Sequence, residues 1–502
     1  MKDMKKIYLI LCLGAMMFMS SCSKDFVTAV HNSAEPLDEY FKDESRMYEG
    51  LVAAYDPTKW FDYFYQYNWL PMLSDIMADD IYCGGSNDGD QPILVKTHYY
   101  TATPTDCCNQ VWTIAYSGIN RSCIVLENVD AVPGMSDEKK NLFKAEATVL
   151  KAYYYSILWK FWGNVPYYDV NLEYPYTCPQ LKADEVYENI VTKLEEAIAL
   201  DVLPMKAAAG LEGRVTKAMA EMLYAECVMY QNDQARYQQA LNYMKDIIDS
   251  GKYSLVSDFA SIWAESGEWG SESIWEINYI SEGGVRDWGA PIATGGNVFS
   301  TLIGIPGGVA GEYDDGWGFA PVAAHAYEMY DEGDQRRDGG IYNILTKDPE
   351  YVTAGHGRWQ STGYFIKKYI ARAGGNHGYI AANTMNYGNN YRVYRYAETL
   401  LNAAELSLLL GQDGTAYLNE VRQRAGCKDT GTDRESIITE RRKEFVGEGK
   451  RYWDLVRTGL AESVLKASNH LYRQTDWTQN KKYWPIPQSE IDKDPALEQN
   501  NY

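Results

Sequence analysis

Residues Glu440 to Gly459 read ERRKEFVGEGKRYWDLVRTG, a stretch in which aromatic and charged side chains alternate. The apolar side chains recur close to a helical period, and we predict one helix over the whole stretch. Glu444 and Glu448 are like charges one helical turn apart, which is unfavourable in an isolated helix. A helix this aromatic is half buried, so its carboxylates and guanidiniums should pair with one another or with a neighbouring helix. This pattern favours a structural brace over an active site.

The same stretch resembles a late helix of the SusD/RagB family, the glycan-binding outer-membrane lipoproteins that partner SusC-type TonB-dependent transporters. The family pattern reads approximately E-R-R-x-E-F-x-G-E-G-x-R-x-x-D-L-x-R-x-G. Every fixed position of that pattern is matched here. The matched residues are Glu440, Arg441, Arg442, Glu444, Phe445, Gly447, Glu448, Gly449, Arg451, Asp454, Leu455, Arg457 and Gly459.

Other segments resemble the family in the same order along the chain. They are KAEATVLKAYYYSILWKFWGNVPYYD (144–169), GRVT (213–216), RVYRYAETLLNAAELSLLLG (392–411), TAYLNEVRQRAG (415–426) and YWPIPQSEIDKDPALEQNNY (483–502). Lys151 replaces a family Arg, Asp494 replaces an Asn, and the Gly before the final Tyr is missing. The resemblance covers nearly the whole chain. It implies an all-α fold of tetratricopeptide-like helical hairpins with a long irregular, loop-rich insert.

Helical periodicity divides the chain into segments. We expect a SusD-like domain over residues 37–502, with helical repeats over about 37–250 and 391–460, a Gly- and Trp-rich insert over about 253–390, and a C-terminal segment over 461–502. Predicted helices cover 70–80, 109–130, 137–162, 183–200, 216–230, 238–250 and 321–331, with another starting at Arg392. Ser136 is the predicted N-cap of the helix at 137–162. Residues 82–105 are predicted to be a loop, and 273–280 a short strand.

The N-terminus carries a targeting signal rather than part of the fold. Three lysines precede an apolar run from Ile7 to Met19, which is too short to span a bilayer. Met19-Ser20-Ser21-Cys22 then reads as a lipobox, with Met19 in place of the usual Leu. We predict a lipoprotein signal peptide over 1–21, a lipid anchor on Cys22 and a tether over 22–36; a plain secretory signal is the alternative. The expected location is the cell outer membrane, with the anchored protein facing the cell surface.

Composition narrows the range of partners. The 502-residue chain has a formal net charge of −22, which argues against nucleic acid as a partner because phosphate binding requires a basic surface. It contains 42 Tyr and 14 Trp, whose rings stack on sugar faces while their polar atoms make hydrogen bonds. The alternative interpretation is a Tyr-rich core, and most of these rings must be core.

The cysteines and acidic loops do not predict a bound metal or a disulfide framework. Beyond the signal and Cys22, seven cysteines remain, an odd number without C-x-x-C spacing. We interpret them as mostly free, small, buried residues. The acidic loop Asp88–Asp90 carries groups of the kind that bind Ca²⁺, but it lacks EF-hand spacing. No cofactor is therefore predicted.

Enzyme signatures are missing from the sequence. It contains no H-E-x-x-H, no G-x-S-x-G and no phosphate-binding loop. Adjacent acidic residues such as Asp79–Asp80 and Asp314–Asp315 are weak evidence for glycosidase chemistry, because 69 acidic residues make such pairs by chance. We predict a binding protein rather than an enzyme.

Candidate ligand-binding residues follow from chemistry and loop position, because the family has no invariant ligand motif. Aromatic candidates lie in the early loops and in the insert, and polar candidates are placed to bond sugar hydroxyls. They are Trp60, Tyr65, Tyr82, Trp288, Tyr313, Trp317 and Trp359, with Asp79, Asn87 and Arg358. For each of them the alternative is a structural role; Trp317, in a Gly-Trp-Gly sequence, can brace a turn. Trp112, Trp159, Trp275 and Trp453 lie in helical or strand contexts and are interpreted as core.

The resemblance implies capture of an oligosaccharide and its delivery to a SusC-like TonB-dependent transporter. The alternative keeps the fold and the transporter but makes the ligand a peptide, as in the RagB branch. A third interpretation is a pure interaction scaffold, because tandem helical hairpins commonly bind proteins. Glycan binding by the isolated soluble domain separates the scaffold from the other two.

Overall fold

The computed structural model of the protein describes residues 37–377 and 383–502. Helices dominate, strands are short, and one hydrophobic core runs through the described chain. The all-α prediction with a loop-rich insert is confirmed. The predicted signal peptide, Cys22 and the tether lie outside the described residues. Over 37–377 and 383–502, no helix combines the length and the apolarity needed to cross a bilayer.

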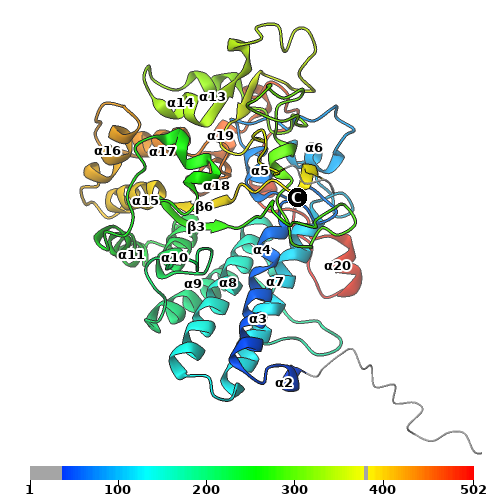
Figure 1. Cartoon of the computed structure of the whole chain (residues 1–502), viewed down its shortest axis with the longest axis vertical. Helices are drawn as coiled ribbons and strands as arrows, with labels where there is room; N and C mark the ends of the chain where they lie inside the picture. The colour runs from blue at the N-terminus through cyan, green and yellow to red at the C-terminus, as the bar shows by residue number, and fades with distance from the viewer. Residues whose placement is uncertain (1–36, 378–382) are drawn as a thin grey trace, which may run out of the picture.

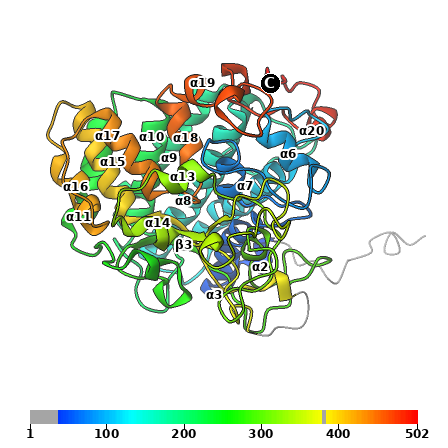
Figure 2. The same ribbon diagram turned by 90° about the horizontal axis from the view of Figure 1, so that it is seen from above.

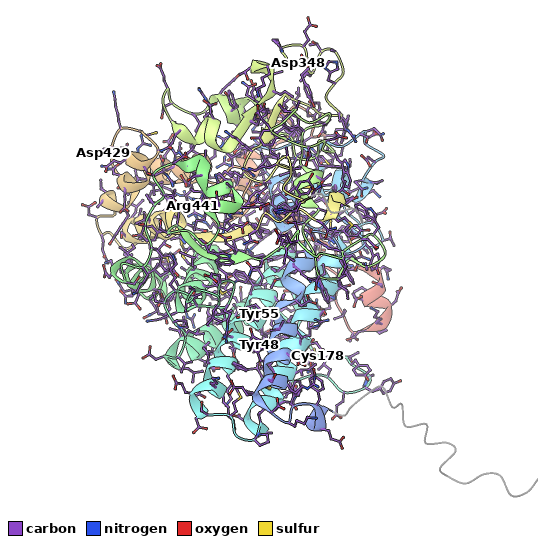
Figure 3. The ribbon with its side chains drawn as sticks, viewed as in Figure 1. Tyr48, Tyr55, Cys178, Asp348, Asp429 and Arg441 are labelled. Atoms are coloured by element: carbon purple, nitrogen blue, oxygen red, sulfur yellow. The ribbon has the colours of Figure 1, made fainter. Side chains whose placement is uncertain are left out.

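The first helices form the elongated lower part of the molecule (Figure 1). Helix α8 packs between α7 and α9, and α7 also packs against α3. Ser136 caps α8 as predicted, since its hydroxyl accepts a hydrogen bond from the Lys139 N–H. Tyr48 and Tyr55 lie along α3 in this part (Figure 3). The bounds are α2 Leu37–Tyr40, α3 Glu44–Tyr55, α4 Pro57–Trp60, α7 Asn109–Asn128, α8 Asp137–Trp162 and α9 Ala183–Ala199.

A second group of helices continues the stack. Helix α10 packs on α9 and α11, α11 packs on α15, and α15 packs on α16. The group lies to one side of the molecule when seen from above, with α14 of the insert beside it (Figure 2). The chain therefore stacks successive helical hairpins, although the insert separates α11 from α15. The bounds are α10 Lys217–Gln231, α11 Tyr237–Asp249, α15 Tyr396–Leu409 and α16 Thr415–Arg424.

The insert consists mainly of loops tied by short helices and two two-stranded antiparallel sheets, β3–β6 and β4–β5. Strands β3 and β6 pair across the two ends of the insert, with Ser273 opposite Arg395 and Ile277 opposite Tyr391. Strand β6 occupies positions where the sequence predicted the start of a helix, which begins instead at Tyr396. The elements are β3 Ser273–Ile277, α12 Phe299–Leu302, α13 Ala324–Glu328, α14 Gln335–Gly340, β4 Ile341–Asn343, β5 Tyr364–Ile366 and β6 Tyr391–Arg395. A third two-stranded sheet, β1 Val165–Pro166 with β2 Gln180–Leu181, lies between α8 and α9.

The predicted single helix over 440–459 is wrong. Helix α17 (Arg434–Glu444) ends before Phe445, and α18 (Arg451–Arg457) starts after a turn. Gly447 and Gly449 adopt φ values of 79° and 75°, which only glycine reaches without strain. A Cβ on Gly449 would lie 2.5 Å from the Pro71 Cα, so this turn also packs directly against another backbone segment.

The same stretch braces the fold through buried ion pairs, as expected. Glu444 lies 3.2 Å from Arg336 and 3.1 Å from Arg395, and Arg395 also pairs with Glu448 at 2.8 Å. Arg441, labelled in Figure 3, pairs with Asp454 at 2.9 Å. Because these charges have almost no exposed surface, each depends on its partners for stabilisation. The 440–459 stretch therefore joins the insert to the second helical group.

Two smaller predictions also need correction. Helix α5 (Leu70–Asp75) is shorter than the predicted helix over 70–80, and α6 (Pro92–His98) lies within the predicted loop 82–105. Pro92 provides a helix start that periodicity over such a short segment does not reveal. The C-terminal segment contains α19 Ala461–Val464 and α20 Gln488–Lys493.

Candidate functional site

Four aromatic rings from three separate segments meet on the surface of the insert. Tyr63 and Tyr67 follow α4, Trp288 lies in the loop after β3, and Trp317 follows α12. The rings of Trp288 and Trp317 stack with centroids 6.0 Å apart and planes 27° apart. Tyr63 packs edge-on against Trp288 at 5.1 Å, and Tyr67 packs edge-on against Trp317 at 5.8 Å. We call these four rings the aromatic platform.

Local backbone structure presents each of these rings. Tyr63 and Tyr67 pair through an antiparallel bridge, so both side chains project from the same tight turn. The Asp287 carboxylate accepts hydrogen bonds from the backbone N–H groups of Gly289 and Ala290 and so fixes the turn that carries Trp288.

Trp317 is held by close backbone packing. Its backbone N–H donates a hydrogen bond to the Thr301 carbonyl at 2.9 Å. A Cβ added to Gly316 would lie 2.2 Å from the carbonyl carbon of Gly304, so only glycine fits before this tryptophan. The Gly-Trp-Gly sequence therefore braces a turn, as the structural alternative proposed, and the same turn places the ring in the platform.

The platform combines accessible ring surface with polar atoms. Trp288 is 39% exposed, and Tyr65, at the tip of the turn between Tyr63 and Tyr67, is 59% exposed. Tyr63, Tyr67 and Trp317 are half-buried. Burial, with a contribution from Tyr63 and Asp90, raises the pKa of Tyr67 well above its ordinary value, so its hydroxyl keeps its proton. Such a surface offers ring faces for stacking and neutral hydroxyl groups for hydrogen bonding.

A polar loop lies beside Trp317. The Asp90 carboxylate accepts a hydrogen bond from the Ser86 N–H, and the Asn87 side chain accepts one from the Gly89 N–H. The Arg358 guanidinium donates to the Ser86 hydroxyl at 3.0 Å. A Cβ on Gly318 would lie 3.6 Å from the Arg358 Cβ, which places this arginine next to the tryptophan turn. We call Ser86, Asn87, Asp90 and Arg358 the polar rim.

Trp359 and Tyr313 lie near the platform without joining its ring contacts. The Trp359 backbone N–H donates to the Gly85 carbonyl at 3.0 Å, and its side chain is half-buried. Tyr313 is half-buried and packs edge-on against Tyr342 at 5.0 Å. Of the residues predicted from the sequence, the structure thus brings together Trp288, Trp317, Asn87 and Arg358, with Trp359 adjacent.

Trp60, Tyr82 and Asp79 lie away from this surface. Trp60 is 4% exposed, with Phe64 stacked on its ring at 5.6 Å and the Arg121 guanidinium over the ring at 4.7 Å. Tyr82 is 5% exposed and packs against the rings of His470 and Tyr472. Both rings are covered by neighbouring side chains, which leaves no face for a sugar.

Asp79 belongs to the ion-pair brace instead. Its carboxylate accepts two hydrogen bonds from Arg451, at 2.9 and 3.0 Å, and lies 3.2 Å from Arg442. At the neighbouring Asp80, burial alone would raise the carboxyl pKa, but Arg442 holds that pKa below its ordinary value. These carboxylates are committed to structural partners.

Tyr63 and Tyr67 were missed as candidates. Both belong to the aromatic cluster KWFDYFYQYN at residues 59–68, and Tyr63, Tyr65 and Tyr67 recur at every second position. That spacing is typical of side chains on one face of an extended segment. The alternation therefore indicates that the three tyrosines share one face, but it does not predict the tight turn.

The described residues offer little support for metal or thiol chemistry. Within residues 37–377 and 383–502, no three His, Cys, Asp or Glu side chains are grouped to hold a metal ion. The seven cysteines there are free, and most are buried, as the sequence predicted. The arrangement on the insert is suited to binding a ligand through ring faces and hydrogen bonds.

Comparisons with known protein families give two matches. A model described as the SusD family matches residues 338–502. A second model, described as starch-binding associating with outer membrane, matches residues 76–225. The two matched ranges cover parts of both helical groups and part of the insert.

Solved structures and curated proteins agree with these matches. The chain is 44% identical to surface glycan-binding protein A from Bacteroides thetaiotaomicron, solved in complex with laminarihexaose, with a TM-score of 0.86 over 92% of this chain and 100% of that chain. A laminarin-binding SusD-like protein is 29% identical, with a TM-score of 0.81 over 91% of this chain and 99% of that chain. SusD-like protein P25 from Formosa agariphila is 24% identical over 92% of each chain.

Proposed function

Because the chain belongs to the SusD/RagB family of surface glycan-binding proteins, we propose that it captures laminarin-type oligosaccharides, β-1,3-linked glucans, on the aromatic platform. The protein binds its ligand and does not cleave it, since the family is non-catalytic. Trp288 and Trp317 supply stacking surfaces, and Tyr63 and Tyr67 flank them. The polar rim forms hydrogen bonds with the hydroxyl groups of the sugar. Trp359 and Tyr313 support the neighbouring loops rather than contact the sugar.

The stacked Trp288–Trp317 pair is the observation that carries this proposal. Two indole rings 6.0 Å apart and 27° from parallel offer adjacent flat surfaces whose planes are tilted relative to each other. A curved glucan presents successive sugar faces in different planes. A pair of tilted rings therefore suits a curved glucan better than it suits a flat, ribbon-like glucan. Each well-placed ring contributes about 0.5–1.5 kcal/mol beyond area burial. A few such contacts give affinities in about the micromolar to millimolar range, which allows release.

The choice of laminarin rests on the relatives. Surface glycan-binding protein A, at 44% identity, was solved with laminarihexaose, and a second relative, at 29% identity, is a laminarin-binding protein. Peptide capture, as in the RagB branch, is the alternative ligand class. The stacked tryptophans beside hydroxyl and amide groups favour a sugar over a peptide, because these rings match the C–H faces of pyranoses.

Delivery to a SusC-like TonB-dependent transporter completes the proposed role. The family is associated with the outer membrane. We extend this to a lipid anchor on Cys22 that holds the protein at the cell surface, where captured glucan passes to the transporter. Weak, reversible binding suits such a transfer, because the glycan must leave the platform for the transporter to take it up.

Calorimetric titration with a matched ligand set tests this proposal. Laminarihexaose, cellohexaose and maltohexaose have the same sugar and length but different linkages. We expect heat from laminarihexaose and at least about tenfold weaker binding of the other two. Equal binding of all three sugars would contradict the proposed linkage preference. No heat of binding from any sugar, together with heat from peptides, would favour the RagB-like alternative.

A further inference from the structure

A buried ion pair joins two segments that carry the aromatic platform. Arg286 is 1% exposed, and Asp62 is fully buried. The two guanidinium NH groups of Arg286 donate to the two carboxylate oxygens of Asp62 at 2.8 and 2.6 Å. Asp62 directly precedes Tyr63, and Arg286 lies two positions before Trp288. A bidentate pair of this kind fixes both distance and orientation.

Every N–H of the Arg286 side chain has an acceptor. Besides Asp62, the guanidinium donates to the carbonyls of Tyr63 at 2.9 Å, Pro291 at 2.7 Å and Gly296 at 2.8 Å. Arginine has five such donors in a planar fork. One side chain therefore ties the Tyr63 turn to both sides of the loop that carries Trp288.

Asp62 extends the same connection to Trp317. Its carboxylate also accepts a hydrogen bond from the Val298 N–H at 2.8 Å, directly before α12. The Thr301 carbonyl in α12 accepts a hydrogen bond from the Trp317 backbone N–H at 2.9 Å. All three ring-bearing segments therefore take their positions from one buried carboxylate and its guanidinium.

The surrounding packing leaves this arrangement little freedom. A Cβ on Gly295 would lie 2.5 Å from the Arg286 Cβ, so the two sides of the loop are in direct contact. The Asn386 amide donates to the Arg286 carbonyl at 3.0 Å. A lysine in place of Arg286 would keep the charge but lose the planar fork and several of the hydrogen bonds.

We propose that Arg286 and Asp62 are positioning residues of the glycan site, which hold the four platform rings in their binding geometry before the sugar arrives. This inference rests on the proposed function. Flat rings bind a saccharide face only when their planes are fixed, and a site that is already ordered avoids the ordering cost on binding. Neither residue touches the ligand; both act through Tyr63, Trp288 and Trp317.

Arg286→Lys and Asp62→Asn test the proposal in the full-length protein purified in detergent. Two properties are measured: the affinity for laminarihexaose, and the exciton-coupled circular dichroism of the Trp288–Trp317 pair, taken as the signal that Trp288→Leu removes. Arg336→Lys is the matched control, because Arg336 is equally buried and bonded to carboxylates but contacts no platform residue. Cooperative thermal unfolding establishes that each variant is folded.

We expect Arg286→Lys and Asp62→Asn, where folded, to lose at least about tenfold in affinity for laminarihexaose and to change the exciton signal. Arg336→Lys should lower the unfolding temperature but leave both platform properties unchanged. If Arg286→Lys does not fold, Asp62→Asn decides, because it keeps the side-chain shape but removes the charge and replaces one acceptor oxygen with an NH2 donor. Wild-type affinity and an unchanged exciton signal in a folded variant would overturn the proposal. The exciton signal does not depend on the sugar, so a failure of the proposed function is recognised separately.

Discussion

The Arg336 guanidinium lies 2.6 Å from the Glu440 carboxylate, and neither side chain has exposed surface. Arg336 also pairs with Asp334 at 2.7 Å and with Glu444 at 3.2 Å. This single residue of α14 therefore pairs with three buried carboxylates and joins the insert to α17. The brace formed around residues 440–459 depends on it.

Removing Arg336 should be among the most destabilising single changes. Arg336→Met leaves Asp334 buried without its cation and removes one of the cations beside Glu440 and Glu444, and we expect it to lower the free energy of unfolding by about 3–5 kcal/mol. Urea unfolding measures the difference. Lys182→Met is the control, because Lys182 and its partner Glu498 are 63% and 76% exposed, and its loss should cost less than about 1 kcal/mol. Equal effects of the two substitutions would contradict the role of the buried brace.

The turn that divides α17 from α18 should tolerate no side chain at Gly449. Gly449→Ala adds a Cβ 2.5 Å from the Pro71 Cα at a φ of 75°, so strain and a backbone clash act together. We expect a loss of more than about 3 kcal/mol in the free energy of unfolding. Gly459→Ala has a similar φ, 72°, with no atom within 4 Å, and should cost about 1–2 kcal/mol. Chemical denaturation of the pair separates the clash from the backbone strain.

Glu221 in α10 should make stability fall as the pH rises. Its carboxyl is fully buried with the Lys217 ammonium 3.7 Å away, and burial raises its pKa to about 9. Between the ordinary carboxyl range and that value, the folded state holds a proton that the unfolded state has released, so raising the pH favours unfolding.

Glu221→Gln removes this dependence because the amide stays neutral. The stability of the variant relative to wild type should increase by about 1–3 kcal/mol between pH 5 and pH 8. Urea unfolding at the two pH values provides the measurement. Glu498→Gln is the control, because Glu498 is 76% exposed and its partner is Lys182, and the change should alter the free energy of unfolding by less than about 1 kcal/mol at either pH. A pH-independent effect of Glu221→Gln would mean that this carboxyl is ionised in the folded protein.

The helical framework was predictable because its signals are local. Ser136 as the N-cap and the long helical run that follows it define α8 from the sequence alone. The division of residues 440–459 was not predicted, since the left-handed conformation of Gly447 and Gly449 is imposed by contacts with Ile366 and Pro71, far away in the chain. Helical periodicity contains no information about such contacts.

The candidate site was predicted only in part, because some of its signals are local and others depend on tertiary packing. Trp288 was recognisable from its setting between Asp287 and Gly289, which favours a turn. The sequence did not reveal that Trp60 is covered by Phe64 and Arg121, because both covering side chains are placed by tertiary packing. The contribution of each platform residue to ligand binding stays a prediction.

Calorimetric titration of laminarihexaose into wild type, Trp288→Ala and Trp317→Ala tests the central claim most directly. Tyr174→Ala is the control, because Tyr174 is 86% exposed on a different loop. We expect wild type and Tyr174→Ala to bind equally, and each tryptophan variant to lose about tenfold or more in affinity. Binding that survives both tryptophan substitutions unchanged would contradict the assignment of the aromatic platform as the glycan site.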